Sequence, residues 1–123
     1  MATKLDDARR YRDVMNQRIL ADAGKGIQRF FALDSASYRP GALDPLTKEL
    51  MGLVGSLVLR CDDCVFYHLD RAVSLDASRE QVEETLQISL VIGGSIVIPH
   101  LRRAWESLDL LLAERAHTKE PTP

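Results

Sequence analysis

Apolar residues recur at steps of three and four along almost the whole chain, and this spacing limits the fold more than any other feature. A clear example is the series Leu46, Leu50, Leu53 and Leu57. Residues spaced in this way share one face of an α-helix, whereas a half-buried strand needs alternation at every second residue. No segment sustains such alternation, and the apolar run at 96–98 has no second strand to pair with. The sequence therefore predicts an all-α protein.

Signals for helix ends divide the chain into five or six helices. Asp44 followed by Pro45 is typical of a helix start, because an N-cap side chain accepts a backbone hydrogen bond and proline suits the first turn. Ser78 with Gln81 three residues later forms a capping box. The paired glycines at 93–94 indicate a helix end.

We expect the helices to form one compact domain over residues 1–116, with a disordered tail over residues 117–123, because 123 residues suit a single core. Sixteen basic residues against eighteen acidic ones give a net charge of −2, which provides no electrostatic support for nucleic-acid binding. No apolar run reaches the roughly 18 residues of a membrane span. The first residues also lack the apolar segment of a secretory signal. A cytoplasmic protein without nucleic-acid or membrane partners is expected.

The segment at 86–98 is apolar on nearly every side. A helix with this character must be buried all round, and a chain of this length has little interior in which to bury it. The pattern predicts a homo-oligomer in which the segment packs against another copy of the chain. The alternative is a central pair of helices within one subunit.

The two cysteines of the chain stand three residues apart, as Cys61 and Cys64. If a helix begins near Cys61, both thiols share a face with His68 and Arg71. The helix N-terminus favours a thiolate, and His68, one turn after Cys64, can accept its proton. The pattern predicts a dithiol that cycles between reduced and disulfide states, in which Cys64 attacks and Cys61 resolves the product.

Two aspartates, Asp62 and Asp63, separate the cysteines. Either can cap the following helix. Their charges also oppose a second negative charge on a neighbouring sulfur, although solvent weakens this effect at an exposed helix tip. We therefore expect a less acidic thiol than one beside basic residues, and a slow peroxidase or a disulfide exchanger.

Other interpretations of the same residues stay open. Cys61, Cys64 and His68 supply three ligands for a structural zinc ion, with Glu49 or His100 as a fourth. The cysteines can also be inert, and Glu49 can simply complement the dipole of its helix. His100 follows a proline near the start of the last helix, where it can line the site or an interface, serve as an acid/base group, or have a structural role.

Residues 42–104, about half of the chain, resemble the carboxymuconolactone decarboxylase superfamily, and within it the alkylhydroperoxidase D-like branch. The resemblance is carried by LDPLTKEL at 43–50, by RCDDC at 60–64 with the following Tyr67-His68, by GGS at 93–95 and by PHLRRA at 99–104. In that branch a glutamate precedes a Cys-x-x-Cys motif by twelve residues, and a histidine follows the second cysteine by four. Glu49, Cys61, Cys64 and His68 fit this pattern.

The resemblance implies a helical fold, trimers or hexamers, and thiol-dependent reduction of hydroperoxides without a bound cofactor. It assigns a proton relay to Glu49 and His68, and regeneration to a dithiol partner such as a lipoyl-bearing or thioredoxin-like protein. Where some members have a histidine between the cysteines, this chain has Asp63. Alternative functions are a non-catalytic oligomeric member of the fold and a decarboxylase-type enzyme that uses His100.

The position of Glu49 raises a geometric question. Roughly 18 Å of continuous helix would separate it from Cys61. Three arrangements bring Glu49 to the cysteines: a break of the helix near Gly52 and Gly55, a steep fold-back of the chain after Cys61, or a contribution from a neighbouring subunit.

Overall fold

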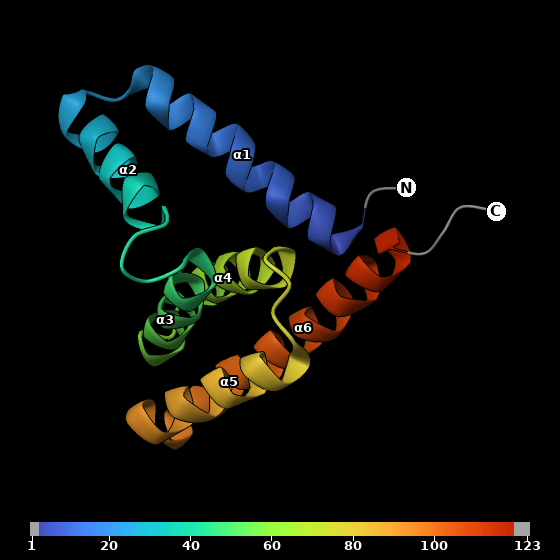
Figure 1. Cartoon of the computed structure of the whole chain (residues 1–123). Helices are drawn as coiled ribbons and strands as arrows, with labels where there is room; N and C mark the ends of the chain where they lie inside the picture. Colours follow the sequence, from blue (N-terminus) through green and yellow to red (C-terminus); the bar gives the residue numbers. More distant parts are fainter. Residues whose placement is uncertain (1–2, 120–123) are drawn as a thin grey trace. The chain divides into compact units, whose positions relative to one another are not determined.

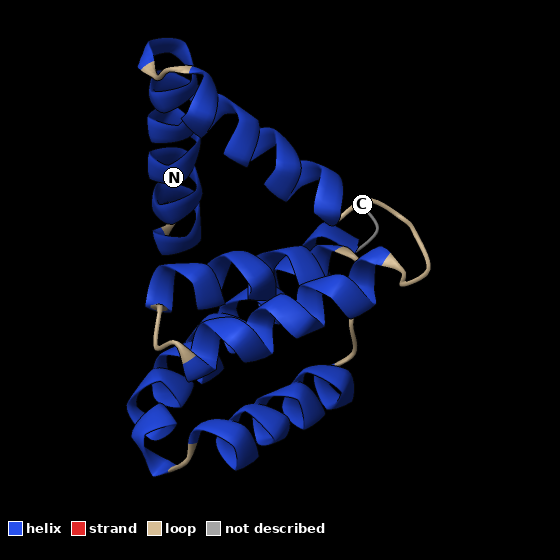
Figure 2. Ribbon diagram, turned by 90° about the vertical axis from the view of Figure 1, so that its left-hand side faces the viewer, coloured by secondary structure: helices blue, strands red, loops and turns tan. Residues whose placement is uncertain are grey.

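The structure is a computed structural model that describes residues 3–119. Figures 1 and 2 show an arrangement of helices joined by short loops, and no strand occurs among the described residues. This confirms the predicted all-α fold and its number of helices. The elements are α1 (Lys4–Asp22), α2 (Lys25–Ser37), α3 (Pro45–Val58), α4 (Asp62–Ser74), α5 (Arg79–Gly93), the short 3-10 helix η1 (Ser95–Val97) and α6 (Ile98–Lys119).

Contacts divide the chain into two compact units, Met1–Arg39 and Pro40–Pro123. The first contains α1 and α2, and the second contains α3 to α6. The single domain over residues 1–116 stays a prediction. Helix α6 continues through 117–119, which the sequence assigned to the tail, because Lys119 bonds Asp76 at 2.7 Å and Thr118 bonds its own helix. The rest of that tail, residues 120–123, lies outside the described residues.

The first unit is a pair of helices. Thr3 and Asp6 form a capping box at the start of α1. Helix α2 ends at Ser37, whose hydroxyl donates a hydrogen bond to the carbonyl oxygen of Leu33 at 2.7 Å. Several large apolar side chains of the two helices are exposed: Tyr11, Val14, Leu20, Ile27, Phe30 and Leu33.

The second unit holds the main core. Helix α3 packs against α4 and α5, and α4 also packs against α6. Leucines and small residues fill the space between them, as their near-zero exposure shows. The principal buried side chains are Leu53, Leu57, Leu69, Val82, Leu86, Val97, Leu108 and Leu111. No helix among residues 3–119 combines the length and the apolar character needed to cross a membrane.

The predicted helix starts are confirmed. Asp44 caps α3 by accepting the Thr47 N–H at 2.7 Å, with Pro45 in the first turn. That hydrogen bond lowers the pKa of Asp44 below its ordinary value, because it favours the charged carboxylate. Ser78 and Gln81 form the capping box that opens α5. The N-caps thus fix where α3, which carries Glu49, begins.

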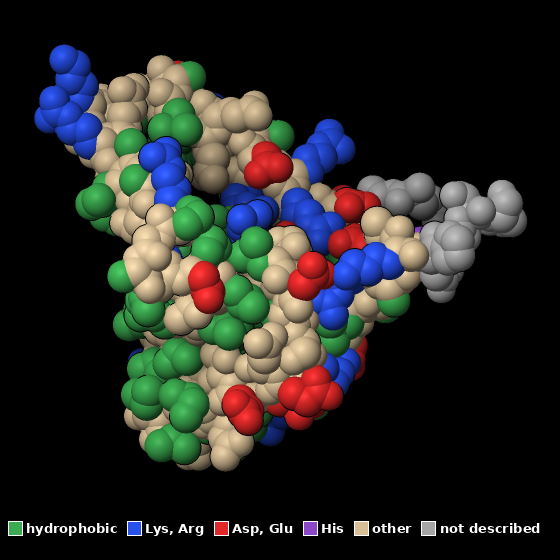
Figure 3. Space-filling view, in the orientation of Figure 1, with side chains coloured by type: hydrophobic (Ala, Val, Ile, Leu, Met, Phe, Trp, Pro, Cys, Tyr) green, Lys and Arg blue, Asp and Glu red, His purple; other side chains and the backbone are tan. Residues whose placement is uncertain are grey.

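The end of α5 is apolar on its surface as well as in the core. Leu86 is buried, whereas Ile88, Val91 and Ile92 are more than half exposed, and Ile96 in η1 is exposed too. Figure 3 shows apolar side chains gathered at the end of the second unit where α5 terminates. A central pair of helices within one subunit therefore does not account for these residues. These side chains are exposed in the single chain, whereas the sequence pattern predicted their burial.

Candidate active site

Cys61 and Cys64 form a disulfide at the start of α4, with their Cα atoms 5.3 Å apart. Cys61 is the N-cap of the helix, and its sulfur accepts the backbone N–H of Cys64 at 3.2 Å. The cap is thus a cysteine and not one of the two aspartates. Cys61 is half-buried and Cys64 is exposed. When the disulfide opens, this hydrogen bond and the helix N-terminus stabilise the thiolate form of Cys61.

A tight turn between α3 and α4 places this disulfide. The N–H of Cys61 bonds the carbonyl of Ser56, and the N–H of Arg60 bonds the carbonyl of Leu57, a pattern that ends helices when one residue adopts the left-handed conformation. Arg60 is that residue, with φ of 61°. Helix α3 is unbroken from Pro45 to Val58, so the second of the three arrangements is the one observed: the chain folds back and α4 packs along α3.

The fold-back brings Glu49 to His68 within the same chain. The Nδ1 atom of His68 lies 2.8 Å from Oε2 of Glu49. The other carboxylate oxygen lies 3.8 Å from Nε of Arg71, one turn further along α4. Glu49 is buried, and the side chain of His68 is mostly buried. A buried carboxylate needs such partners, because an isolated charge in the interior is strongly unfavourable.

Gly52 makes room for the His68 ring. A Cβ atom at Gly52 would lie 2.5 Å from Cε1 of His68, closer than real side chains approach. By contrast, a Cβ at Gly55 would meet nothing within 4 Å. Of these two glycines, Gly52 is therefore the one that lies at a close helix contact. The ring is held between the α3 backbone on one side and the Glu49 carboxylate at its Nδ1 atom.

A second carboxylate–histidine pair includes Asp62, which lies between the two cysteines. Nδ1 of His100 lies 2.8 Å from Oδ1 of Asp62, and a guanidinium nitrogen of Arg103 lies 3.4 Å from Oδ2. Both partners come from the beginning of α6. The sequence indicates that His100 can line the site, but it does not indicate a pairing with Asp62. No local signal joins two residues 38 positions apart.

The contacts of Asp62 change the expected electrostatics of the motif. The sequence predicted that two carboxylates would oppose a thiolate. In the structure the Asp62 charge faces a guanidinium and an imidazole, while Asp63 is exposed to solvent. Compensation by Arg103 and screening by water both weaken the repulsion.

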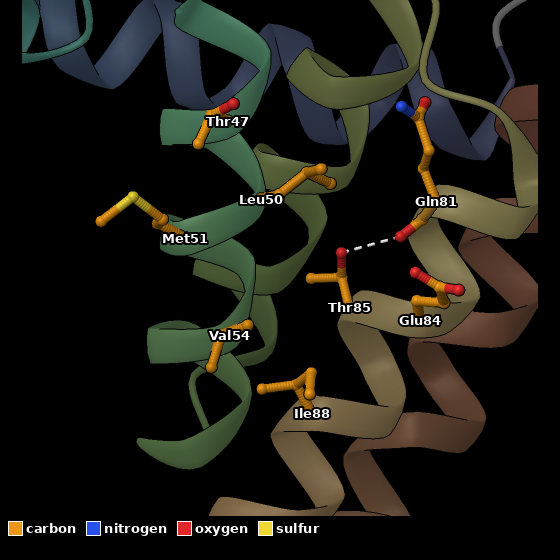
Figure 4. Close-up of a pocket in the computed structure, with 8 residues that line it drawn as sticks. All are labelled: Thr47, Leu50, Met51, Val54, Gln81, Glu84, Thr85 and Ile88. Atoms are coloured by element: carbon orange, nitrogen blue, oxygen red, sulfur yellow. Dashed lines mark hydrogen bonds between the residues drawn. The ribbon is translucent and has the colours of Figure 1, made fainter. Parts of the chain in front are cut away.

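A separate hollow of about 330 Å³ lies between α3 and α5. Figure 4 shows Leu50, Val54 and Ile88 facing this space from the two helices, with Thr85 bonded to the backbone of Gln81. None of Cys61, Cys64, Glu49 or His68 lines it. Across residues 3–119, no group of three or more His, Cys, Asp or Glu side chains is arranged to hold a metal ion.

Comparison with known proteins identifies relatives of the chain. Residues 25–107 match the model of the carboxymuconolactone decarboxylase family. An uncharacterized protein of Cupriavidus necator is 32% identical over 84 residues, which are 68% of this chain and 74% of that protein. A second uncharacterized protein, encoded in the cox locus of Paracoccus denitrificans, is 29% identical over 65% of this chain and 72% of its own length.

Two solved structures share the fold. A carboxymuconolactone decarboxylase family protein of Thermotoga maritima, for which a role in the antioxidative response has been suggested, superposes with a TM-score of 0.85 at 50% identity, covering 98% of this chain and 100% of that one. A family protein of Legionella pneumophila has a TM-score of 0.79 at 25% identity, with coverage of 88% and 96%.

Proposed function

The chain belongs to the carboxymuconolactone decarboxylase family, and we propose that it is a thiol-dependent oxidoreductase of the alkylhydroperoxidase D-like type. Its substrate is a hydroperoxide or the disulfide of a partner protein. One observation carries the proposal: Cys61 and Cys64 pair at the start of α4, and His68 on the next turn is bonded to the buried Glu49. The suggested antioxidative role of the Thermotoga maritima protein supports the same chemistry.

In the proposed peroxide reaction, His68 accepts the proton of the Cys64 thiol, with Glu49 stabilising the charged imidazole. The thiolate attacks the terminal peroxide oxygen and the O–O bond breaks. The leaving alkoxide takes the proton from His68, which gives an alcohol and a sulfenic acid on Cys64. Cys61 then attacks that sulfur, the S–S bond forms, and water leaves. Two thiols thus supply the two electrons that reduce the peroxide.

Regeneration requires a dithiol partner, such as a lipoyl-bearing or thioredoxin-like protein. One partner thiolate attacks the exposed Cys64 sulfur and expels Cys61, whose thiolate is stabilised by the N–H of Cys64. The second partner thiol then attacks the mixed disulfide, so that the partner becomes oxidised and both cysteines here return to thiols. Such continuous re-reduction suits a cytoplasmic protein.

Mass spectrometry after peroxide treatment tests the proposal. The reduced chain is expected to lose two hydrogen atoms, located between Cys61 and Cys64, and to consume hydroperoxide when dithiothreitol or a lipoyl dithiol is supplied. Cys64→Ser is expected to abolish turnover, whereas Cys61→Ser should trap a sulfenic acid or a mixed disulfide. Thiols that stay unchanged under peroxide would refute the proposal.

The same samples separate the alternative functions. A decarboxylase-type activity that uses His100 would survive alkylation of both cysteines, whereas the proposed activity would not. A structural zinc site would appear as stoichiometric zinc in protein purified without chelators. A non-catalytic member of the fold would show neither turnover nor a peroxide-dependent change in mass.

We further propose that the chain forms a homo-oligomer, a trimer or hexamer, through the exposed apolar side chains at the end of α5. The pattern at 86–98 calls for burial, and the single chain leaves Val91 and Ile92 exposed. Light scattering coupled to gel filtration is expected to give a multiple of 13.8 kDa. Val91→Glu should lower the mass toward one chain, while Gln87→Glu, on an exposed position of the same helix, should leave it unchanged.

A further inference from the structure

Asp62 occupies the first position of α4, directly after Cys61. When the disulfide opens, a thiolate forms within one turn of this carboxylate. Two negative charges so close together raise the energy of the thiolate, and the thiolate is the reactive form of the cysteine. A chain that works through these sulfurs therefore benefits from any group that compensates Asp62.

The beginning of α6 provides such groups. Nδ1 of His100 lies 2.8 Å from one oxygen of Asp62, and the guanidinium of Arg103 lies 3.4 Å from the other. Both carboxylate oxygens thus face donors from a single helix, which the core residues Ala104 and Leu108 anchor in the fold. His100 is mostly buried, so its ring is held by packing as well as by the carboxylate.

We propose that His100 is a positioning residue for the cysteine pair: it fixes Asp62 against the start of α6, where Arg103 compensates the carboxylate, and so protects the thiolate from repulsion. This inference deepens the proposed function and takes the dithiol chemistry of that site as given. It assigns His100 a role that acts through Asp62, without contact to the reacting atoms.

The other charged groups around the motif do not replace this arrangement. On the motif itself, Asp63 is exposed to solvent and Arg60 precedes Cys61 in the left-handed turn. From α3, Glu49 faces the site, but its carboxylate is already paired with His68. Repulsion from Asp62 is therefore balanced chiefly by the two α6 side chains.

The pH dependence of thiol alkylation tests the inference on the reduced, full-length protein. His100→Ala frees the Asp62 carboxylate, so the midpoint of the iodoacetamide rate profile is expected to rise by about half a pH unit, the effect of one unit charge a few Å away in a water-like dielectric. Asp62→Asn is expected to lower the midpoint. The double variant should match Asp62→Asn alone, because His100 acts only through that carboxylate.

His100→Asn provides a matched control, since an asparagine amide places a neutral donor near the position of Nδ1. Its midpoint should stay close to that of the unmodified chain. The inference is overturned if His100→Ala leaves the midpoint unchanged, if the asparagine variant behaves like the alanine variant, or if the double variant shifts upward from Asp62→Asn. Circular dichroism melts verify that each variant is folded before the profile is measured.

Alkylation needs neither a hydroperoxide nor a partner protein, so the two proposals fail separately. If the alkylation midpoint responds as expected but the protein consumes no hydroperoxide and exchanges with no disulfide, the positioning role of His100 stands and the proposed function fails. If the protein has peroxidase turnover but its alkylation midpoint does not change in the His100 variants, the proposed function stands and this inference fails.

Discussion

Two carboxylate–histidine pairs flank the disulfide. The distance between histidine and carboxylate is the same in both pairs, but their burial differs. Glu49–His68 and Asp62–His100 are both 2.8 Å between Nδ1 and a carboxylate oxygen. The carboxylate is 3% exposed in the first pair and 41% exposed in the second. The two pairs therefore differ not in their distance but in how far water reaches the carboxylate.

The difference in burial suits the two pairs to different roles. A charge pair deep in the protein interacts strongly and cannot be replaced by water, so it suits proton transfer and loses much when one member is removed. A pair near the surface is weakened by solvent and salt, so it adjusts the local field without carrying the structure. We therefore propose acid–base work for Glu49 and His68, and charge compensation for Asp62 and His100.

The largest expected effect concerns activity. Glu49→Gln removes the charge that stabilises a protonated His68, so peroxide turnover should fall by about 100-fold or more. Asp62→Asn should change turnover by less than about tenfold, because solvent already screens that carboxylate. Steady-state assays with a dithiol reductant measure both. Glu84→Gln makes the same chemical change at an exposed position of α5 and serves as the control. Equal losses at Glu49 and Asp62 would erase the distinction.

Stability should separate the histidines as well. His68→Ala leaves Glu49 buried without its nearest partner, and a cost of about 3 kcal/mol in the free energy of unfolding is expected. His100→Ala leaves a carboxylate that water can reach, so, apart from the ring packing that both variants lose, its electrostatic cost should stay below about 1 kcal/mol. Urea unfolding of the oxidised proteins gives both values. A large loss at His100 with none at His68 would reverse the comparison.

Gly52 offers a purely steric way to disturb the buried pair. Gly52→Ala inserts a methyl group 2.5 Å from a ring that Glu49 holds in place, so we expect a loss of about 1–3 kcal/mol and a fall in turnover. Gly55→Ala, three residues away in the same helix, meets nothing within 4 Å and should gain up to about 1 kcal/mol from helix propensity. If both variants gain stability, the His68 ring is not fixed as described.

Local chemistry explains what the sequence could predict. The spacing of apolar residues predicted the helices, and the side chains at Asp44 and Ser78 predicted where two of them begin. The shared face of Cys64, His68 and Arg71 follows from helix geometry, and the structure places the last two beside Glu49. Glu49 lies four residues before Leu53 and so shares its helix face, which is the sequence signal of a core position.

Features that depend on the path of the chain could not be predicted in this way. The fold-back that unites Glu49 and His68 requires Arg60 to take a left-handed conformation that its side chain does not favour. The Asp62–His100 pair depends on how α6 returns to the start of α4. Cys61 also took the capping position that two neighbouring aspartates could have filled. In each case the packing of distant helices decided the local outcome.

The smallest expected effect tests how much water weakens the exposed pair. Arg103→Met removes the cation 3.4 Å from Asp62. Its cost in the free energy of unfolding should be below about 1 kcal/mol at low salt. The cost should vanish near 1 M salt, because charges are then screened within about 3 Å. Arg102→Met, on the exposed neighbouring residue, is the matched control. The cost of His68→Ala should persist in 1 M salt, because ions do not reach Glu49. An Arg103 cost that is large and insensitive to salt would mean that Asp62 is shielded from solvent, and the two pairs would then be alike.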